Sequence, residues 1–251
     1  MALLSHRLCD TTLARFDDLR AAAPGAVLLL TEPLGEAVRR AGLDAALVLS
    51  PDEIFLPAYG AKSASRRILP GNADLALLAL RRARPRHARY WLAEYDVFLP
   101  GGAALLAALD AASDADLLLP LRPATRAEAP QWHHWPGLVI PPGEAVADTV
   151  QRHALLCLVR AGAALLDALD AAYRRGWAGH AEAVLPTLAA AGGFATETLN
   201  AVARRALGRK ATDGRAFNAF RCQPSAGALI CHPVKTEPAA QALRATLAAS
   251  T

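Results

Sequence analysis

Lysine, cysteine and aromatic residues are scarce in this sequence, and long apolar runs are missing. Lysine contributes only three of the 27 basic residues, and no basic block or basic–aromatic platform typical of nucleic-acid binding is present. The four cysteines contain no CxxC pair, which favours reduced thiols in a cytosolic protein. No apolar stretch reaches the roughly 18 residues of a membrane span, and Arg7 and Asp10 interrupt the N-terminal run too early for a signal peptide. These absences predict a cytoplasmic protein without a transmembrane segment or a nucleic-acid partner.

The chain does contain enough apolar surface for a large core. It has 251 residues, of which 53% are hydrophobic, and a formal net charge of +4. Arginine carries most of the positive charge, and its planar guanidinium suits the oxygens of phosphates. No internal repeat or low-complexity linker divides the chain, so we expect one α/β domain over residues 1–251.

Strand-like and helix-like segments alternate along the first half, which is typical of an α/β fold. The expected strands cover 2–7, 26–31, 45–49, 90–93 and 117–120, and the expected helices cover 10–20, 34–41, 72–82 and 103–112. Later segments predict two consecutive helical stretches over 150–175, a helix over 183–191, a hairpin over 217–231 and a short helical tail.

Two carboxylates follow the strand expected over 90–93. Glu94 and Asp96 are two residues apart, so on an extended chain they would project to the same side. Ligands of open α/β sheets bind beyond the carboxyl ends of the strands, which makes this pair a candidate metal or substrate site; the alternative is ordinary surface charge. A second pair, Asp114 and Asp116, precedes its strand and is better explained as turn chemistry.

Two loops could also contribute to a site. The stretch 50–70 is rich in proline and glycine and carries Lys62, Arg66 and Arg67, which could hold a diphosphate or could form a solvated surface loop. Trp132, His133, His134 and Trp135 cluster in an irregular segment that could stack on a sugar or a nucleobase, bind a metal, or pack as a crossover.

The remaining candidates lie in the second half. Glu182 belongs to a glycine-flanked segment, and His232 and Lys235 stand near the C-terminus. Carboxylates together with an imidazole suit Mg²⁺ or Mn²⁺, which bridge diphosphate oxygens, and a separate carboxylate could deprotonate a hydroxyl group.

The motifs of the chain resemble those of GT-A-type nucleotide-sugar glycosyltransferases, in particular bacterial proteins with a Trp-Leu-x-Glu-Tyr-Asp-Val motif. The resemblance depends on four segments that together span most of the chain: Ser5-His6-Arg7, Tyr90-Trp91-Leu92-Ala93-Glu94-Tyr95-Asp96-Val97, Gly179-His180-Ala181-Glu182 with Pro186-Thr187, and His232-Pro233-Val234-Lys235. It implies a GT-A-like, Rossmann-type mixed sheet flanked by helices. Residues 1–120 would be the nucleotide-binding half, and residues 121–251 the acceptor side with a C-terminal metal and phosphate segment.

The resemblance also implies roles for individual residues. Asp96 and His232 would bind a divalent cation, with Glu94 near the metal's water shell, the ribose or the sugar. Lys235 would meet a phosphate, as the composition of the loop 50–70 suggests for Lys62, and Ser5 and His6 would lie near the nucleotide. Glu182 would be the base for the acceptor hydroxyl if the enzyme inverts. The implied activity is a hexosyltransferase reaction in bacterial glycan or polysaccharide synthesis, from a nucleoside diphosphate sugar to a glycan or small-molecule hydroxyl.

Two other functions compete with this interpretation. A metal-dependent hydrolase could use His6, Asp96, His133, His134 or His232, but the sequence has no HExxH or HxH spacing. A serine hydrolase is disfavoured because no G-x-S-x-G elbow exists. The other alternative is a non-catalytic GT-A-like domain that binds a nucleotide, a carbohydrate or a protein partner.

Overall fold

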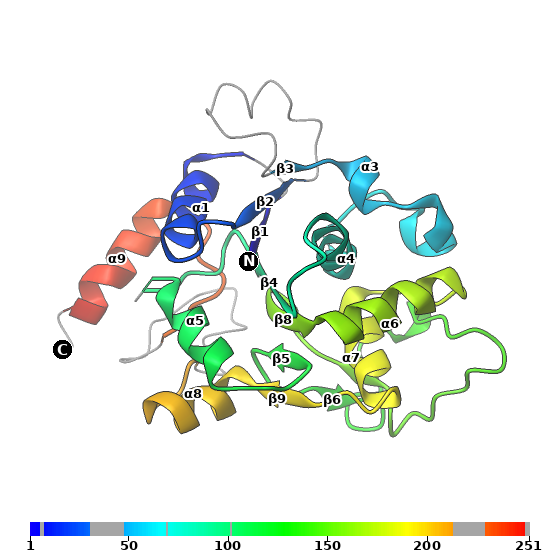
Figure 1. The fold of residues 1–251 in the computed structure, drawn as a ribbon. Helices are drawn as coiled ribbons and strands as arrows, with labels where there is room; N and C mark the ends of the chain where they lie inside the picture. Colours follow the sequence, from blue (N-terminus) through cyan, green and yellow to red (C-terminus); the bar gives the residue numbers. More distant parts are fainter. Residues whose placement is uncertain (6–7, 31–47, 69, 101, 213–228, 249–251) are drawn as a thin grey trace.

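The computed structural model describes residues 1–5, 8–30, 48–68, 70–100, 102–212 and 229–248 (Figure 1). Within these ranges, seven strands form one mixed sheet in the order β3-β2-β1-β4-β8-β5-β9. Their bounds are β1 (Ala2–Ser5), β2 (Val27–Leu30), β3 (Val48–Leu49), β4 (Arg89–Glu94), β5 (Leu117–Leu119), β8 (Leu158–Gly162) and β9 (Thr196–Thr198). The first four strands in the order are parallel, and β8 runs antiparallel to both β4 and β5. The prediction of an α/β mixed sheet flanked by helices is therefore confirmed.

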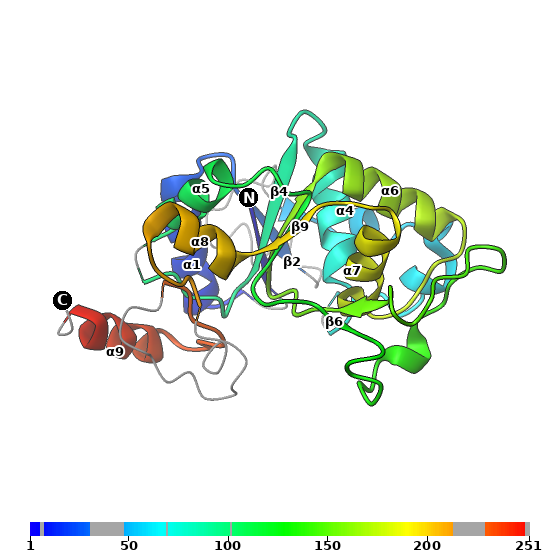
Figure 2. The same ribbon diagram turned by 90° about the horizontal axis from the view of Figure 1, so that it is seen from below.

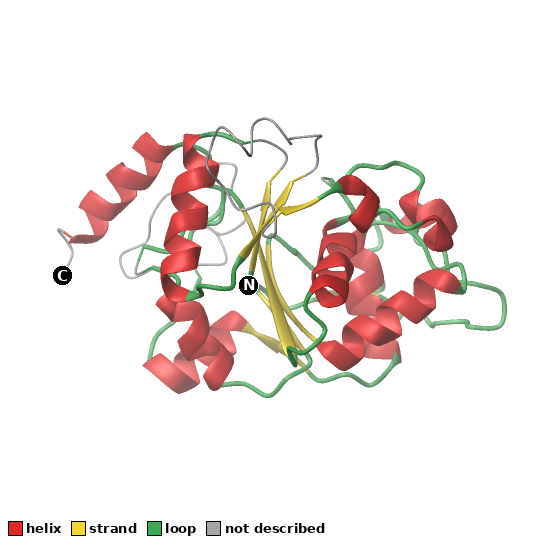
Figure 3. Cartoon of the chain, turned by 45° about the horizontal axis from the view of Figure 1, so that its top comes forward, coloured by secondary structure: helices red, strands yellow, loops and turns green. Residues whose placement is uncertain are grey.

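Helices cover both faces of the sheet (Figures 1, 2 and 3). One face carries α4 (Ala73–Ala83), α6 (Ala163–Arg174) and α7 (Ala181–Ala191), and the other carries α1 (Asp10–Ala22), α5 (Ala104–Ala111) and α8 (Leu199–Leu207). Side chains alternate along β4: Leu92 packs in the core beneath α4, α6 and α7, whereas Trp91 and Ala93 pack in the core beneath α1, α5 and α8. This alternation builds two hydrophobic cores, one on each side of the sheet.

Shorter elements complete the fold. The loop expected over 50–70 contains α3 (Pro51–Ile54) and the 3₁₀ helix η2 (Pro57–Ser63), and a small two-stranded sheet pairs β6 (Ala124–Thr125) with β7 (Arg152–His153). A second 3₁₀ helix, η3 (Trp135–Gly137), lies in the tryptophan–histidine segment. The expected C-terminal helix forms as α9 (Glu237–Ala248) and packs Ala240 and Leu243 in a third apolar cluster with Phe98. Among the described residues, no helix combines the length and apolar character that crossing a bilayer requires.

The prediction of helix over the first part of 150–175 is wrong. That part forms β7 and β8, and only Ala163–Arg174 is helical. All five residues of β8 are buried, since the strand lies between β4 and β5 with helices on both faces. A strand buried on both faces has no polar–apolar alternation, and short apolar runs of this kind resemble buried helix segments in sequence. The expected helix 34–41 and most of the expected hairpin over 217–231 lie outside the described residues.

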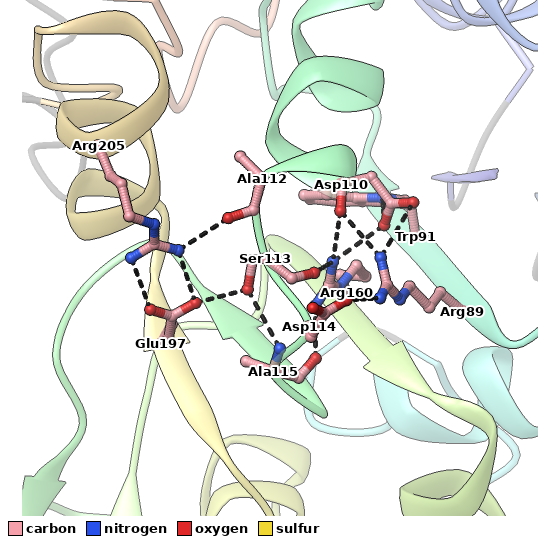
Figure 4. Close-up of polar contacts among 10 residues, drawn as sticks. All are labelled: Arg89, Trp91, Asp110, Ala112, Ser113, Asp114, Ala115, Arg160, Glu197 and Arg205. Atoms are coloured by element: carbon pink, nitrogen blue, oxygen red, sulfur yellow. Dashed lines mark hydrogen bonds and ion pairs between the residues drawn. The ribbon is translucent and has the colours of Figure 1, made fainter.

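A buried arginine joins β8 to the end of α5 (Figure 4). The guanidinium of Arg160 is completely buried and donates to Asp110 Oδ1 at 3.0 Å, to the Ser113 carbonyl at 2.8 Å and to the Ala115 carbonyl. Burial lowers the pKa of Arg160, and the Asp110 carboxylate opposes that change. The cation thus satisfies the carbonyl groups that follow the C-terminal end of α5, where positive charge is favoured.

We expect Arg160→Met to lower the free energy of unfolding by about 3–5 kcal/mol, because it leaves buried carbonyls and the Asp110 carboxylate without their partner. Urea unfolding followed by circular dichroism measures this change. Arg205→Met is the control, since its half-exposed pair with Glu197 (Figure 4) is screened by solvent and should contribute little to stability. Equal losses in the two variants would contradict the interpretation.

Candidate functional site

A cleft of about 570 Å³ opens at the carboxyl end of β4, and Glu94, Asp96, Glu182 and Lys235 are among the residues that line it. Leu4 pairs with Glu94 in the parallel register of β1 and β4. Glu94 is the last residue of β4, whereas Asp96 lies in a turn in which the Val97 amide donates to the Glu94 carbonyl at 2.9 Å. The chain is therefore not extended through Asp96, as the same-side argument assumed, but the turn directs both carboxylates to this cleft.

Glu182 reaches the cleft from the first turn of α7. His180 is the N-cap of this helix, and its Nδ1 accepts the Glu182 amide at 3.3 Å. The Glu182 carboxylate accepts the Leu156 amide at 3.3 Å, just before β8. Gly179 precedes the cap with a φ of +128°, and a Cβ there would lie 2.7 Å from the Gly137 carbonyl oxygen. Only glycine fits this position, so the Gly-His-Ala-Glu segment is shaped by packing as well as by chemistry.

His232 is brought to the acids by backbone pairing. Phe98 and Cys231 exchange two hydrogen bonds of 2.9 Å, and the Val234 amide donates to the Asp96 carbonyl at 2.7 Å. This pairing places His232 Nε2 3.5 Å from Asp96 Oδ1, and it places Lys235 at the edge of the cleft.

The carboxylates of Glu94, Asp96 and Glu182 repel one another, and each has lost part of its solvation. Burial raises the pKa of Glu94 to about 7, where Asp96 and Glu182 add to the rise while His232 and Lys235 oppose it. Burial also raises the pKa of Glu182 to about 7, against the opposing effects of the Leu156 amide and His232. The site therefore concentrates negative charge that a cation would stabilise.

The residues fit a divalent cation. Glu94, Asp96 and His232 each offer one ligand atom, and these atoms lie within 4.8 Å of one another. Asp96 Oδ1 is buried and has no hydrogen-bond partner, which is costly unless a ligand satisfies it. Carboxylate oxygens with one imidazole nitrogen suit Mn²⁺ or Mg²⁺.

The other predicted ligand-binding residues do not line this cleft. Ser5 is buried at the end of β1, where its Oγ lies 3.1 Å from Thr12 Oγ1. His6 lies outside the described residues. Lys62, predicted to meet phosphate, instead forms a buried pair with Asp74 at 3.0 Å and donates to the carbonyls of Gly71 and Gly179 at 3.3 and 2.8 Å. Its ammonium supports the loops that frame the site, so we do not count Lys62 among the ligand-binding groups.

His134 and His180 also line the cleft. The sequence pointed to His134 through the tryptophan–histidine segment but gave no role to the His180 side chain. One local feature of the sequence does indicate His180. It stands two residues before Glu182 at the N-cap position of α7, where a polar side chain is directed to the first turn of the helix.

Comparison of the chain with protein-family models and with curated proteins gave no match in either case.

We expect Mn²⁺ to raise the thermal stability of the protein through Asp96 and His232. A cation at a hundredfold excess over its dissociation constant should add about 2.7 kcal/mol to the free energy of unfolding. Differential scanning fluorimetry with Mn²⁺ and with EDTA measures the shift, and Asp96→Asn and His232→Gln should abolish it. Asp114→Asn is the control, because this carboxylate is fully exposed and pairs with Arg89 away from the cleft. A shift that survives Asp96→Asn would exclude this metal site.

We also expect Glu182 to make the protein less stable as the pH rises. The folded-state pKa of Glu182 is about 7, above its ordinary value of 4.5, so its contribution is complete below pH 4.5 and is lost between about pH 4.5 and 7. In EDTA, Glu182→Gln should gain about 2–3 kcal/mol relative to the unmodified chain across this window.

Urea unfolding at a series of pH values measures this difference. Glu94, His180 and His232 face Glu182, and the variant also removes the effect of Glu182 on the pKa of Glu94, so the difference reports Glu182 together with its coupling to Glu94. Glu197→Gln should show the opposite slope, because Arg205 and Ser113 lower the pKa of Glu197. Parallel curves for Glu182→Gln and the unmodified chain would refute the prediction.

Proposed function

We propose that this protein is a glycosyltransferase that moves a sugar from a nucleoside diphosphate sugar to an acceptor hydroxyl. The observation that carries the proposal is that Glu94, Asp96 and Glu182 line one cleft, while the His232 imidazole offers a ligand atom within 4.8 Å of those of Glu94 and Asp96. A cation site beside a second, separate carboxylate provides the two elements that such a transfer needs. The resemblance of the sequence motifs to GT-A-type glycosyltransferases supports the same function.

Each side chain has a distinct task in this proposal. Asp96, His232 and Glu94 hold a divalent cation, which when bound supplies positive charge against the leaving diphosphate. The Lys235 ammonium, at the rim of the cleft, contacts the phosphate oxygens of the donor. Glu182 accepts the proton of the acceptor hydroxyl, a task that a pKa of about 7 suits at neutral pH.

We propose a direct displacement. The acceptor oxygen forms a bond to the anomeric carbon while the bond from that carbon to the diphosphate oxygen breaks. The electron pair of the broken bond leaves with the nucleoside diphosphate, and the hydroxyl proton passes to Glu182. A single displacement inverts the anomeric configuration, which NMR of the product determines.

We expect Glu182→Gln to lower kcat by about 10²–10⁴-fold, because the amide cannot accept the hydroxyl proton. Asp96→Asn should remove most activity, whereas Asp114→Asn should leave activity unchanged. The assay measures nucleoside diphosphate release from UDP-, GDP-, dTDP- and ADP-sugars, with Mn²⁺ and a panel of glycan acceptors. Undiminished transfer in both cleft variants would defeat the proposal.

This assay and differential scanning fluorimetry with nucleoside diphosphates together separate the competing functions. Release of free sugar that does not depend on any acceptor indicates a hydrolase. Stabilisation by nucleoside diphosphates without turnover of any donor indicates a binding domain. Stabilisation by nucleotide that requires Mn²⁺, followed by transfer, supports the glycosyltransferase.

A further inference from the structure

A second hollow adjoins the cleft on the side of Glu182. It measures about 390 Å³, shares Gly71, His134 and His180 with the cleft, and extends over His133 and Gly137. His180 Nδ1 lies 3.9 Å from Glu182 Oε2, so the hollow begins beside the proposed base.

Three imidazole rings form a column along this hollow, which we name the histidine column: His133, His134 and His180. The rings of His134 and His180 are stacked with centroids 3.9 Å apart and planes inclined by 15°, and the centroid of His133 lies 3.9 Å from that of His134. Trp132 meets His134 and His180 edge-on, with centroids 5.0 and 5.9 Å away. His133 is exposed, so the column reaches from solvent to the first turn of α7.

The two inner rings of the column, His134 and His180, are uncharged at neutral pH. Burial lowers the pKa of His180 to about 4, and His134, Lys62 and His133 add to this effect. Burial and the neighbouring His133 likewise lower the pKa of His134. No arginine, lysine or carboxylate is among the residues that line this hollow in the described part of the chain. A phosphate or carboxylate ligand would find no countercharge there.

Neutral imidazoles match a different ligand chemistry. Each ring has one N–H donor and one nitrogen acceptor, and a sugar hydroxyl likewise both donates and accepts. In His180 the Nδ1 atom accepts the Glu182 amide, so the proton of the neutral ring is on Nε2.

The backbone that lines the hollow is held by a buried ammonium group. The Lys62 ammonium, whose side chain is 1% exposed, joins the carbonyls of Gly71 and Gly179 and pairs with Asp74. Gly71 has a φ of +102°, and a Cβ at this position would lie 3.1 Å from the His180 ring. These contacts fix the floor of the hollow relative to Glu182.

We propose that the histidine column is the subsite for the acceptor, and that the acceptor is an uncharged carbohydrate whose reacting hydroxyl lies next to Glu182. This inference rests on the proposed function, which supplies the role of Glu182. It adds the acceptor class, which the sequence motifs do not specify.

The experiment measures carbohydrate binding without any donor. The histidine ring resonances of the protein are followed by ¹⁵N NMR during titration with methyl glucoside, methyl galactoside and methyl N-acetylglucosaminide. Glucose 6-phosphate, glucuronic acid, UDP and GDP are titrated in parallel. We expect at least one neutral glycoside to shift the column resonances saturably and the charged sugars to bind no more tightly.

Variants test where the glycoside binds. His134→Ala and His133→Ala should weaken binding by about tenfold, the loss of one or two hydrogen bonds. His133 is exposed, so its variant retains the packing of the fold. The matched control is His153→Ala: this ring stacks on Trp132 at 4.6 Å but lines neither hollow, and binding should stay within about twofold.

Four results would overturn the subsite. These are column resonances that no glycoside shifts, binding unchanged by both column variants, tighter binding of the charged sugars, or nucleoside diphosphates shifting the column in place of glycosides. Failure of the proposed function is recognised separately. Glycoside binding at the column without turnover of any donor would contradict the proposed glycosyltransferase activity but support a carbohydrate subsite. Transfer with an unchanged acceptor KM in His134→Ala would contradict the subsite alone.

Discussion

The site depends on one stretch of backbone pairing between the end of β4 and the segment before α9. The hydrogen bonds between Phe98 and Cys231, and from Val234 to Asp96, lay the C-terminal segment against the turn that holds Asp96. Because side chains follow the backbone that carries them, this pairing alone brings His232 to the two acids. The apolar cluster of Phe98, Cys231 and Val234 with α9 holds the pairing in place. The C-terminal helix therefore contributes to the site without touching it.

Charge at the site is balanced differently from charge elsewhere in the fold. Arg160 and Lys62 are buried, but each meets a carboxylate and several carbonyls, so most of their lost solvation is compensated within the chain, although Arg160 Nε has no hydrogen-bond partner. Asp96 is also buried and Glu94 is half-buried, yet Asp96 Oδ1 has no hydrogen-bond partner and Glu94 holds its proton more tightly than usual. An incomplete balance of this kind is typical of positions where a ligand supplies the missing charge.

The cleft and the second hollow differ in the charge of the side chains that line them. The main cleft carries carboxylates and Lys235, which suit a cation and a diphosphate, whereas the second hollow is lined by no arginine, lysine or carboxylate among the described residues, and burial lowers the pKa values of His134 and His180. Glu182 lies where the two meet, because His180 belongs to the column and also caps the helix that presents Glu182. One short segment, Gly179 to Glu182, therefore couples the position of the proposed base to the wall of the second hollow.

Local pattern alone determined the strand that ends at Glu94, the helices that begin at Asp10 and Ala73, and the α/β class, since apolar runs and helical periodicity act over a few residues. Local pattern did not identify β8, because its short apolar run continues directly into α6 and resembles the start of a buried helix. Only the tertiary structure decided that Lys62 is a buried support, that His180 joins two hollows, and that His232 meets Asp96. Those outcomes depend on burial and on contacts between segments far apart in the chain, and neither quantity is encoded in the spacing of neighbouring residues.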